Sequence, residues 1–235
     1  MMRKRFLFLF FPLLILLLAA CGAAPQVEPT PAPATPTSAP APPPAAAGQT
    51  IFIIDSEQSE ASYAVEERFL EKALPKLGIQ PGVVTTVGVT KKVEGEIRVN
   101  LDDLTQPPVG TVIRVDLSAL TSDQPRRDKW IKENGPSFFK YPIAEFKATA
   151  IRNAPASYTE GQEIAFQLAG DLTIRDITHP VVFDVRAKLA NGVLTGQATA
   201  QIKMSDYGIE PLNFANTLTV ADEVTLTVDL VARQK

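Results

Sequence analysis

The feature that most constrains this chain is a long run of alternating apolar and polar residues over 164–189. In its first half, the apolar side chains occupy positions 164, 166, 168, 172 and 174, and after a break at 175–180 they move to 181, 183, 185, 187 and 189. A period of two indicates half-buried strands, because successive side chains of a strand point to opposite faces. The first half alone would extend over roughly 30 Å, which suits a tilted barrel strand better than a sandwich strand. We therefore expect a hairpin of long strands in a barrel that can enclose a ligand.

The same alternation recurs along the chain and predicts an all-β fold of about eight strands, mostly antiparallel. Turn signals such as Asn191-Gly192 and Pro107-Pro108 separate several of the segments. The predicted strands cover 93–99, 113–117, 194–204 and 224–232, with shorter candidates at 51–54, 62–65 and 146–151.

Two stretches break the alternation. Residues 66–77 fit either a short helix or a strand that frays into an insertion. Residues 123–134 predict a helix, because Pro125 suits a first turn, Ser122 or Asp123 can cap it, and Asn134-Gly135 can end it. An aromatic stretch bounded by prolines, 136–142, follows this helix.

The N-terminus predicts export. A charged stretch, 3–5, precedes an apolar run of 15 residues, 6–20, which is short for a membrane span but typical of a signal peptide. The run ends in Leu-Ala-Ala-Cys, which resembles the bacterial lipobox, so we expect a signal peptide over 1–20 and lipidation of Cys21. A plain secretory signal or a short anchor is the alternative. Cys21 is the only cysteine, which excludes a disulfide within the chain.

Residues 21–49 are expected to form a tether, and residues 50–235 the folded domain. Nine of the chain's 20 prolines fall in 22–49, where Glu28 is the only charge, so this segment favours extended conformations. A proline-rich recognition motif is the alternative. Without the signal, the chain carries 20 Lys and Arg against 26 Asp and Glu, a net charge of −6. No basic cluster remains, and we expect no nucleic acid partner.

Spread over the folded part are motifs that resemble the YceI-like family. They are 53–65, Arg127-Asp128 with the aromatic residues that follow, Gly-Asp-Leu-Thr-Ile at 170–174 with Thr178, Pro180 and Val181, 202–209, and 222–232. The resemblance implies an extended, lipocalin-like, eight-stranded antiparallel barrel in an exported protein, here tethered to the bacterial cell membrane or envelope by lipid. Several family members are associated with binding an isoprenoid chain such as a polyprenyl or quinone tail.

The chain departs from the family pattern at three places. Gln58-Ser59 stands where His-Ser is common, Tyr207 where Phe is common, and Lys203 or Met204 replaces an Arg. Residues 71–91 form a longer insertion than usual, which we expect to act as a lid or to change the mouth of the barrel.

Little in the sequence favours catalysis. His179 is the only histidine and the only candidate for the base of a triad, and next to Pro180 we expect it in a solvent-facing turn, which argues against that role. One histidine and one lipidated cysteine make a zinc site improbable, and no phosphate-binding loop is present. We therefore expect neither an enzyme nor a metal or cofactor site, apart from a bound lipid.

The candidate binding residues are apolar. The small inward side chains in 194–202 leave unfilled space inside a barrel, unless large side chains such as Phe166 and Phe183 fill it. Aromatic residues after the helix either line a pocket or close one end of the core. Arg127-Asp128 is either a contact to a ligand head group or a helix cap or surface ion pair. The expected lining comprises Phe138, Phe139, Tyr141, Phe146, Phe166, Leu168, Phe183, Leu194, Ala198, Ala200 and Ile202.

The leading hypothesis is a membrane-tethered extracytoplasmic protein that carries or sequesters a hydrophobic, isoprenoid-type chain inside its barrel. The alternative is a structural or stress-related envelope module whose barrel is filled. An enzyme is the least favoured reading. The sequence does not indicate the ligand's identity, the oligomeric state, or the inner or outer membrane.

Overall fold

The computed structural model describes residues 48–70, 82–156, 158–214 and 217–235. The predicted signal peptide, Cys21 and nearly all of the tether lie outside these residues, as do residues 71–81 of the insertion. The expected loop is wrong for 82–90, which form a strand. Within the described ranges, no helix is both long and apolar enough to cross a membrane.

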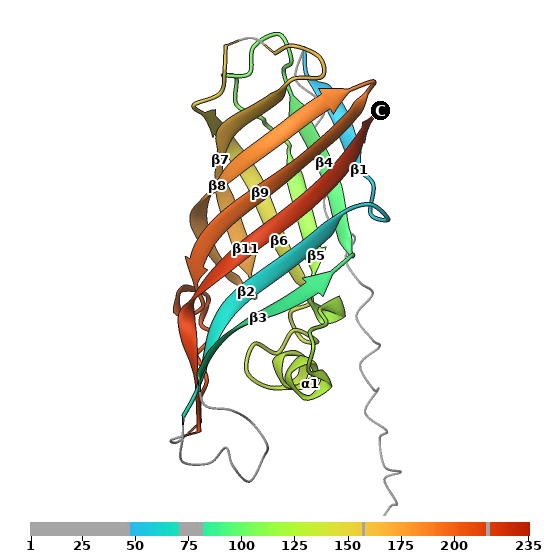
Figure 1. The fold of residues 1–235 in the computed structure, drawn as a ribbon. Helices are drawn as coiled ribbons and strands as arrows, with labels where there is room; N and C mark the ends of the chain where they lie inside the picture. Colours follow the sequence, from blue (N-terminus) through green and yellow to red (C-terminus); the bar gives the residue numbers. More distant parts are fainter. Residues whose placement is uncertain (1–47, 71–81, 157, 215–216) are drawn as a thin grey trace, which may run out of the picture. The chain divides into compact units, whose positions relative to one another are not determined.

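The strands close into an antiparallel barrel of eight, as predicted (Figure 1). The ring closes because β1 pairs with β4 on one side and with β11 on the other. In ring order the strands are β1 (Thr50–Ile54), β4 (Val93–Val99), β5 (Val112–Asp116), β6 (Ile143–Arg152), β7 (Glu163–Ile174), β8 (Ile177–Ala190), β9 (Val193–Lys203) and β11 (Leu218–Gln234).

Strand β11 is long enough to pair with two strands along one of its edges. Its C-terminal end pairs with β1, and its first part pairs with β2 (Glu60–Phe69), which in turn pairs with β3 (Gly82–Thr90). The short strand β10 (Asn213–Phe214) pairs with the start of β11. Residues 66–69 belong to β2, so the helical reading of 66–77 is wrong there, and 71–77 lie outside the described residues.

The β7–β8 hairpin confirms the two long strands and corrects their turn. Glu163 pairs with Lys188 and Ile174 with Ile177, so only Arg175 and Asp176 remain for the turn. Arg175 takes a positive φ of 52°, as a tight turn requires.

His179 and Pro180 lie inside β8, so the expected turn at His179 is wrong. The pairing of β8 with β9 starts only at Asp184. One edge of β8 is therefore unpaired at Pro180, and a proline is tolerated there.

The predicted helix is α1 (Pro125–Glu133), which begins with Pro125 in its first turn. Its cap differs from the expectation, because the N-cap residue is Gln124 and makes no side-chain capping bond. Instead Asp128, inside the helix, accepts hydrogen bonds from the backbone N–H and the hydroxyl of Ser122, at 2.9 and 2.6 Å. A 3-10 turn, η1 (Leu117–Ala119), precedes α1, and another, η2 (Ser205–Tyr207), follows β9.

Apolar side chains from the inner faces form two clusters. One gathers near α1 and η2, where the Phe146 and Phe183 rings meet edge to face with centroids 5.0 Å apart. The other joins β1, β4 and β11 through side chains that include Phe52, Val93 and Ala232. The inner faces are thus apolar, as alternation predicts, but they do not fill the barrel.

Candidate functional site

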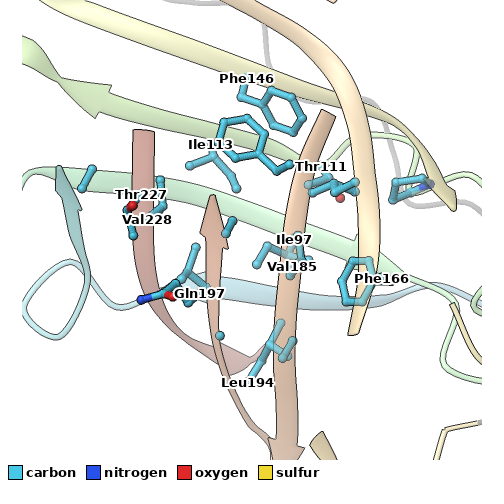
Figure 2. Close-up of a pocket in the computed structure, with 18 of the residues that line it drawn as sticks. Ile97, Thr111, Ile113, Phe146, Phe166, Val185, Leu194, Gln197, Thr227 and Val228 are labelled. Atoms are coloured by element: carbon cyan, nitrogen blue, oxygen red, sulfur yellow. The ribbon is translucent and has the colours of Figure 1, made fainter. Parts of the chain in front are cut away.

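An internal cavity of about 230 Å³ occupies the barrel. Phe146, Phe166, Ile113 and Val185 come from four different strands and surround the same space (Figure 2). Many inward side chains, such as Val185, Val228 and Leu230, are only partly buried because they face this space instead of a neighbouring side chain. An apolar space of this kind favours an apolar occupant over water.

The cavity is elongated along the strands. Ile164 and Ile174, near the two ends of β7, both border it. Ten residues of strand extend over roughly 33 Å, and a tilt of about 40° leaves roughly 25 Å along the barrel axis. Since the volume is modest for that length, the space is a narrow channel that suits a linear chain better than a compact molecule.

Small residues on two neighbouring strands, β8 and β9, border this channel. Ala187 of β8 pairs with Gly196 of β9, and Val185 pairs with Ala198. A side chain at Gly196 would lie 2.8 Å from the Arg186 carbonyl oxygen. Gly170 adds no volume, because the Phe146 ring covers it.

Six of the predicted lining residues do border the cavity. Phe166 and Phe183, which might have filled the barrel, stand in the cavity wall and leave the channel free. Whether these side chains bind a ligand stays a prediction. The six are Phe146, Phe166, Leu168, Phe183, Leu194 and Ala198.

Ala200 and Ile202 do not border the cavity. They follow Ala198 on the inner face of β9, but there the barrel is filled by the cluster near α1 and η2, in which Ala200 is buried and against which Ile202 packs. The alternation identified their face correctly, whereas the point at which the cavity ends depends on packing from distant segments.

The aromatic stretch after α1 closes the core and does not line the cavity. The Phe138 and Phe139 N–H groups donate to carbonyl oxygens of Ile131 and Lys132, which fixes the stretch against the helix. Phe138 is then buried in the cluster near α1, while Phe139 is 60% exposed. The Tyr141 ring lies on the outside, with the Arg175 guanidinium 5.2 Å from its centroid.

Sequence reasoning missed a second group of cavity residues. For most of them the predicted alternation had the correct inward parity, and that parity was the available signal, but the residues carry no distinctive motif. They include Tyr63, Ile97, Ile113, Val115, Leu226, Val228 and Leu230. Tyr63 lies in the strand candidate 62–65, for which no parity was predicted.

Arg127 and Asp128 act separately, and neither borders the cavity. The Arg127 guanidinium donates two hydrogen bonds, of 2.8 and 2.9 Å, to the carboxylate of Glu67, an inner-face residue of β2 that is almost fully buried. Burial lowers the Arg127 pKa, but the bonds to Glu67 and Asp123 outweigh it, and the net direction is upward. Arg127 therefore attaches α1 to the barrel through a buried ion pair with Glu67. Neither interpretation from the sequence, a ligand contact or a helix cap or surface ion pair, predicted this role.

His179 contacts an aromatic residue at the α1 end. It pairs with Leu172 across the hairpin and therefore has inner-face parity, and its ring meets Tyr207 edge to face at 5.3 Å. Burial raises the pKa of the Tyr207 phenol to about 12. Across the described ranges, no three His, Cys, Asp or Glu side chains group as a metal site would need.

Comparisons with known proteins agree with this architecture. A family model for the YceI-like domain matches residues 52–232. No curated protein is similar enough to count as a match.

Three solved structures share the fold at low sequence identity. BcnA of Burkholderia cenocepacia is 20% identical, with a TM-score of 0.56, and the match covers 76% of this chain and 98% of BcnA. A polyisoprenoid binding domain from Saccharophagus degradans, implicated in plant cell wall breakdown, is 11% identical, with a TM-score of 0.55 and coverage of 78% and 98%. A Campylobacter jejuni YCEI protein is 15% identical, with a TM-score of 0.50 and coverage of 63% and 84%.

Proposed function

Since the chain belongs to the YceI-like family, we propose that its barrel binds a linear hydrophobic chain of isoprenoid type in the internal cavity and carries or sequesters it unchanged. The polyisoprenoid binding of the Saccharophagus degradans domain supports this ligand class.

The observation that carries the proposal is the length and lining of the cavity. A channel that runs from Ile164 to Ile174 matches the shape of an extended hydrocarbon chain. Removing such a chain from water is favourable by about 25 cal/mol for each Å² of apolar surface buried. A filled barrel would lack this channel, so the cavity favours binding over a purely structural role.

We also propose where in the cell the protein is located. The lipobox-like sequence before Cys21 supports lipidation, and the proline-rich segment 21–49 supports a tether that holds the domain at a membrane outside the cytoplasm. A tether of 29 residues in an extended conformation would reach up to roughly 90 Å. Globomycin treatment, which blocks lipoprotein signal cleavage, should cause a precursor to accumulate, whereas a Cys21→Ser variant should lose membrane association. A Cys21→Ser variant that stays at the membrane would refute the anchor.

Native mass spectrometry with lipid extraction tests the binding role. The full chain, purified from its membrane, should carry a hydrophobic chain, and delipidated protein should rebind a polyprenyl lipid. Ala198→Phe should block rebinding, because the new ring occupies the cavity. Gln201→Phe is the matched control, since it places the same ring on the exposed face of the same strand. A protein that is empty and refuses polyprenyl lipids would contradict the proposal.

A further inference from the structure

At one end of the cavity lies a hydroxyl group that makes no hydrogen bond to the described part of the protein. Tyr63 of β2 borders the cavity, and its ring lies over the backbone of Gly88 on β3. Its hydroxyl oxygen lies 2.9 Å from where a Cβ at Gly88 would stand, so only glycine at position 88 leaves room for this ring.

Tyr63 marks the end of the cavity that is nearer to α1. Beyond the level of Tyr63, the next inward residues on β2 and on two strands beside it are Val65 on β2, Val224 on β11 and Ala200 on β9. All three are buried, and none borders the cavity. At the other end, Leu104 and Pro108 from the loop between β4 and β5 contribute to the wall, far from α1 (Figure 1).

The other inward polar groups of the cavity wall already have partners. The Thr111 hydroxyl donates to the Arg98 carbonyl oxygen and accepts from the Arg98 N–H. The Tyr158 hydroxyl donates to the Leu189 carbonyl oxygen, and the Thr90 hydroxyl accepts from the Lys92 N–H at 3.1 Å. In contrast, the Tyr63 hydroxyl has no hydrogen-bond partner among the described residues.

Tyr63 lies near one positive group, Arg127, and three negative groups, Glu67, Asp123 and Asp128, so the surroundings of its hydroxyl are net negative. Arg127 is bonded through two nitrogens to Glu67, on the same face of β2 as Tyr63, and also to Asp123. Burial raises the pKa of the Tyr63 hydroxyl to about 12, so this group keeps its proton and can donate a hydrogen bond. An anion at this end would compete with Glu67 for Arg127, whereas a neutral oxygen would not.

We infer, on the premise of the proposed function, that the Tyr63 hydroxyl binds the polar end of the ligand, an uncharged oxygen that accepts a hydrogen bond. The apolar chain then extends from Tyr63 along the channel toward Leu104 and Pro108. The ligand class is therefore a neutral amphiphile, such as a prenyl alcohol or a prenylated carbonyl compound, and not a prenyl diphosphate.

Binding of hexaprenol, squalene and hexaprenyl diphosphate to the delipidated full chain tests this. The three probes have equal isoprene content but carry an alcohol, no oxygen and a diphosphate. One hydrogen bond from Tyr63 should make hexaprenol bind about fivefold to tenfold more tightly than squalene. The diphosphate should bind more weakly than hexaprenol. In Tyr63→Phe the preference for hexaprenol over squalene should vanish while squalene affinity is kept.

Tyr141→Phe is the matched control, because it removes a tyrosine hydroxyl that lies outside the cavity, and it should keep the preference. Equal binding of hexaprenol and squalene by the unmodified chain, or an unchanged preference in Tyr63→Phe, would overturn the role of Tyr63 and leave the proposed function standing. Tighter binding of the diphosphate than of hexaprenol would overturn the neutral head group. Failure to bind any of the three probes would overturn the proposed function as well.

Discussion

The pair formed by Glu67 and Arg127 is a buried ion pair whose two members should be strongly coupled. The Glu67 side chain is 6% exposed and that of Arg127 18%, and both carboxylate oxygens accept a bond from the guanidinium. Replacing Arg127 by Met leaves the buried carboxylate without its partner. Losing one member of a buried pair costs about 3–5 kcal/mol, and the partial exposure of Arg127 places this loss near 3 kcal/mol.

The reverse replacement should cost less. In Glu67→Met, Arg127 keeps its bonds to Asp123 and Ser122, so a loss of about 1–2 kcal/mol follows. In the double variant no charge is left unpaired inside the barrel, and the loss should be about 1 kcal/mol or less. The coupling energy of the double-mutant cycle is then about 3–4 kcal/mol.

Urea and thermal unfolding of the four proteins measure this cycle. For a domain of this size, Arg127→Met should lower Tm by roughly 6–12 °C. Arg114 and Glu145 provide a matched control on the outside of the barrel, where the side chains are 32% and 22% exposed, and Arg114→Met should cost about 1 kcal/mol or less. If the losses of the two single Glu67 and Arg127 variants simply add in the double variant, the reasoning is wrong.

Two further predictions concern stability. Gly170→Ala should destabilise the barrel by about 2–3 kcal/mol, because a Cβ would overlap the Phe146 ring and the backbone of β6, and urea unfolding measures the loss; a neutral outcome would show that β6 can shift. The hydrogen bond from the Ser205 hydroxyl, with further bonds from backbone N–H groups, holds the Asp222 pKa below its ordinary value against the opposing effect of burial. A lowered pKa stabilises the fold above the ordinary aspartate value of about 3.9, and this contribution is lost as the pH falls through the folded-state pKa. The Tm difference between the wild type and Ser205→Ala should therefore shrink between pH 7 and pH 2, and a constant difference would argue against the linkage.

Alternation alone predicted much of the barrel, because it reports directly which face of a strand is apolar. It assigned Ile164, Phe166, Val185 and Leu194 to the inner face, where the structure has them. It also predicted most of the strands that form the ring, whereas the closure of eight strands into a barrel was implied by the family resemblance.

The limits of the cavity were not predictable in this way. Ala198 and Ala200 have the same parity and the same side chain, yet only Ala198 borders the cavity. Ala200 is buried in a cluster that also contains Phe138, from the stretch after α1, and Tyr207, from η2, whereas Ala198 is only partly buried against that cluster. Local patterns do not report such contacts.

His179 and Glu67 illustrate two other limits. The proline after His179 suggested a turn, but the unpaired edge of β8 accommodates it within a strand. The sequence pattern did not identify Glu67 as an inward residue, because an acidic side chain interrupts the apolar alternation of β2. Its place inside the barrel makes sense only with Arg127, 60 residues later in the sequence.

The way in which β11 closes the ring has a consequence for biosynthesis. This strand pairs with β9 along its length and with β1 and β2 on its other edge, so it joins the earliest strands of the domain to a late one. Until β11 has been made, β1 and β9 each have an open edge and the interior is open to water. Such long-range pairing folds slowly and exposes edges that aggregate. The nascent domain must therefore remain unfolded or shielded until nearly all of it has been synthesised, and its interior can be closed off from water only after that point.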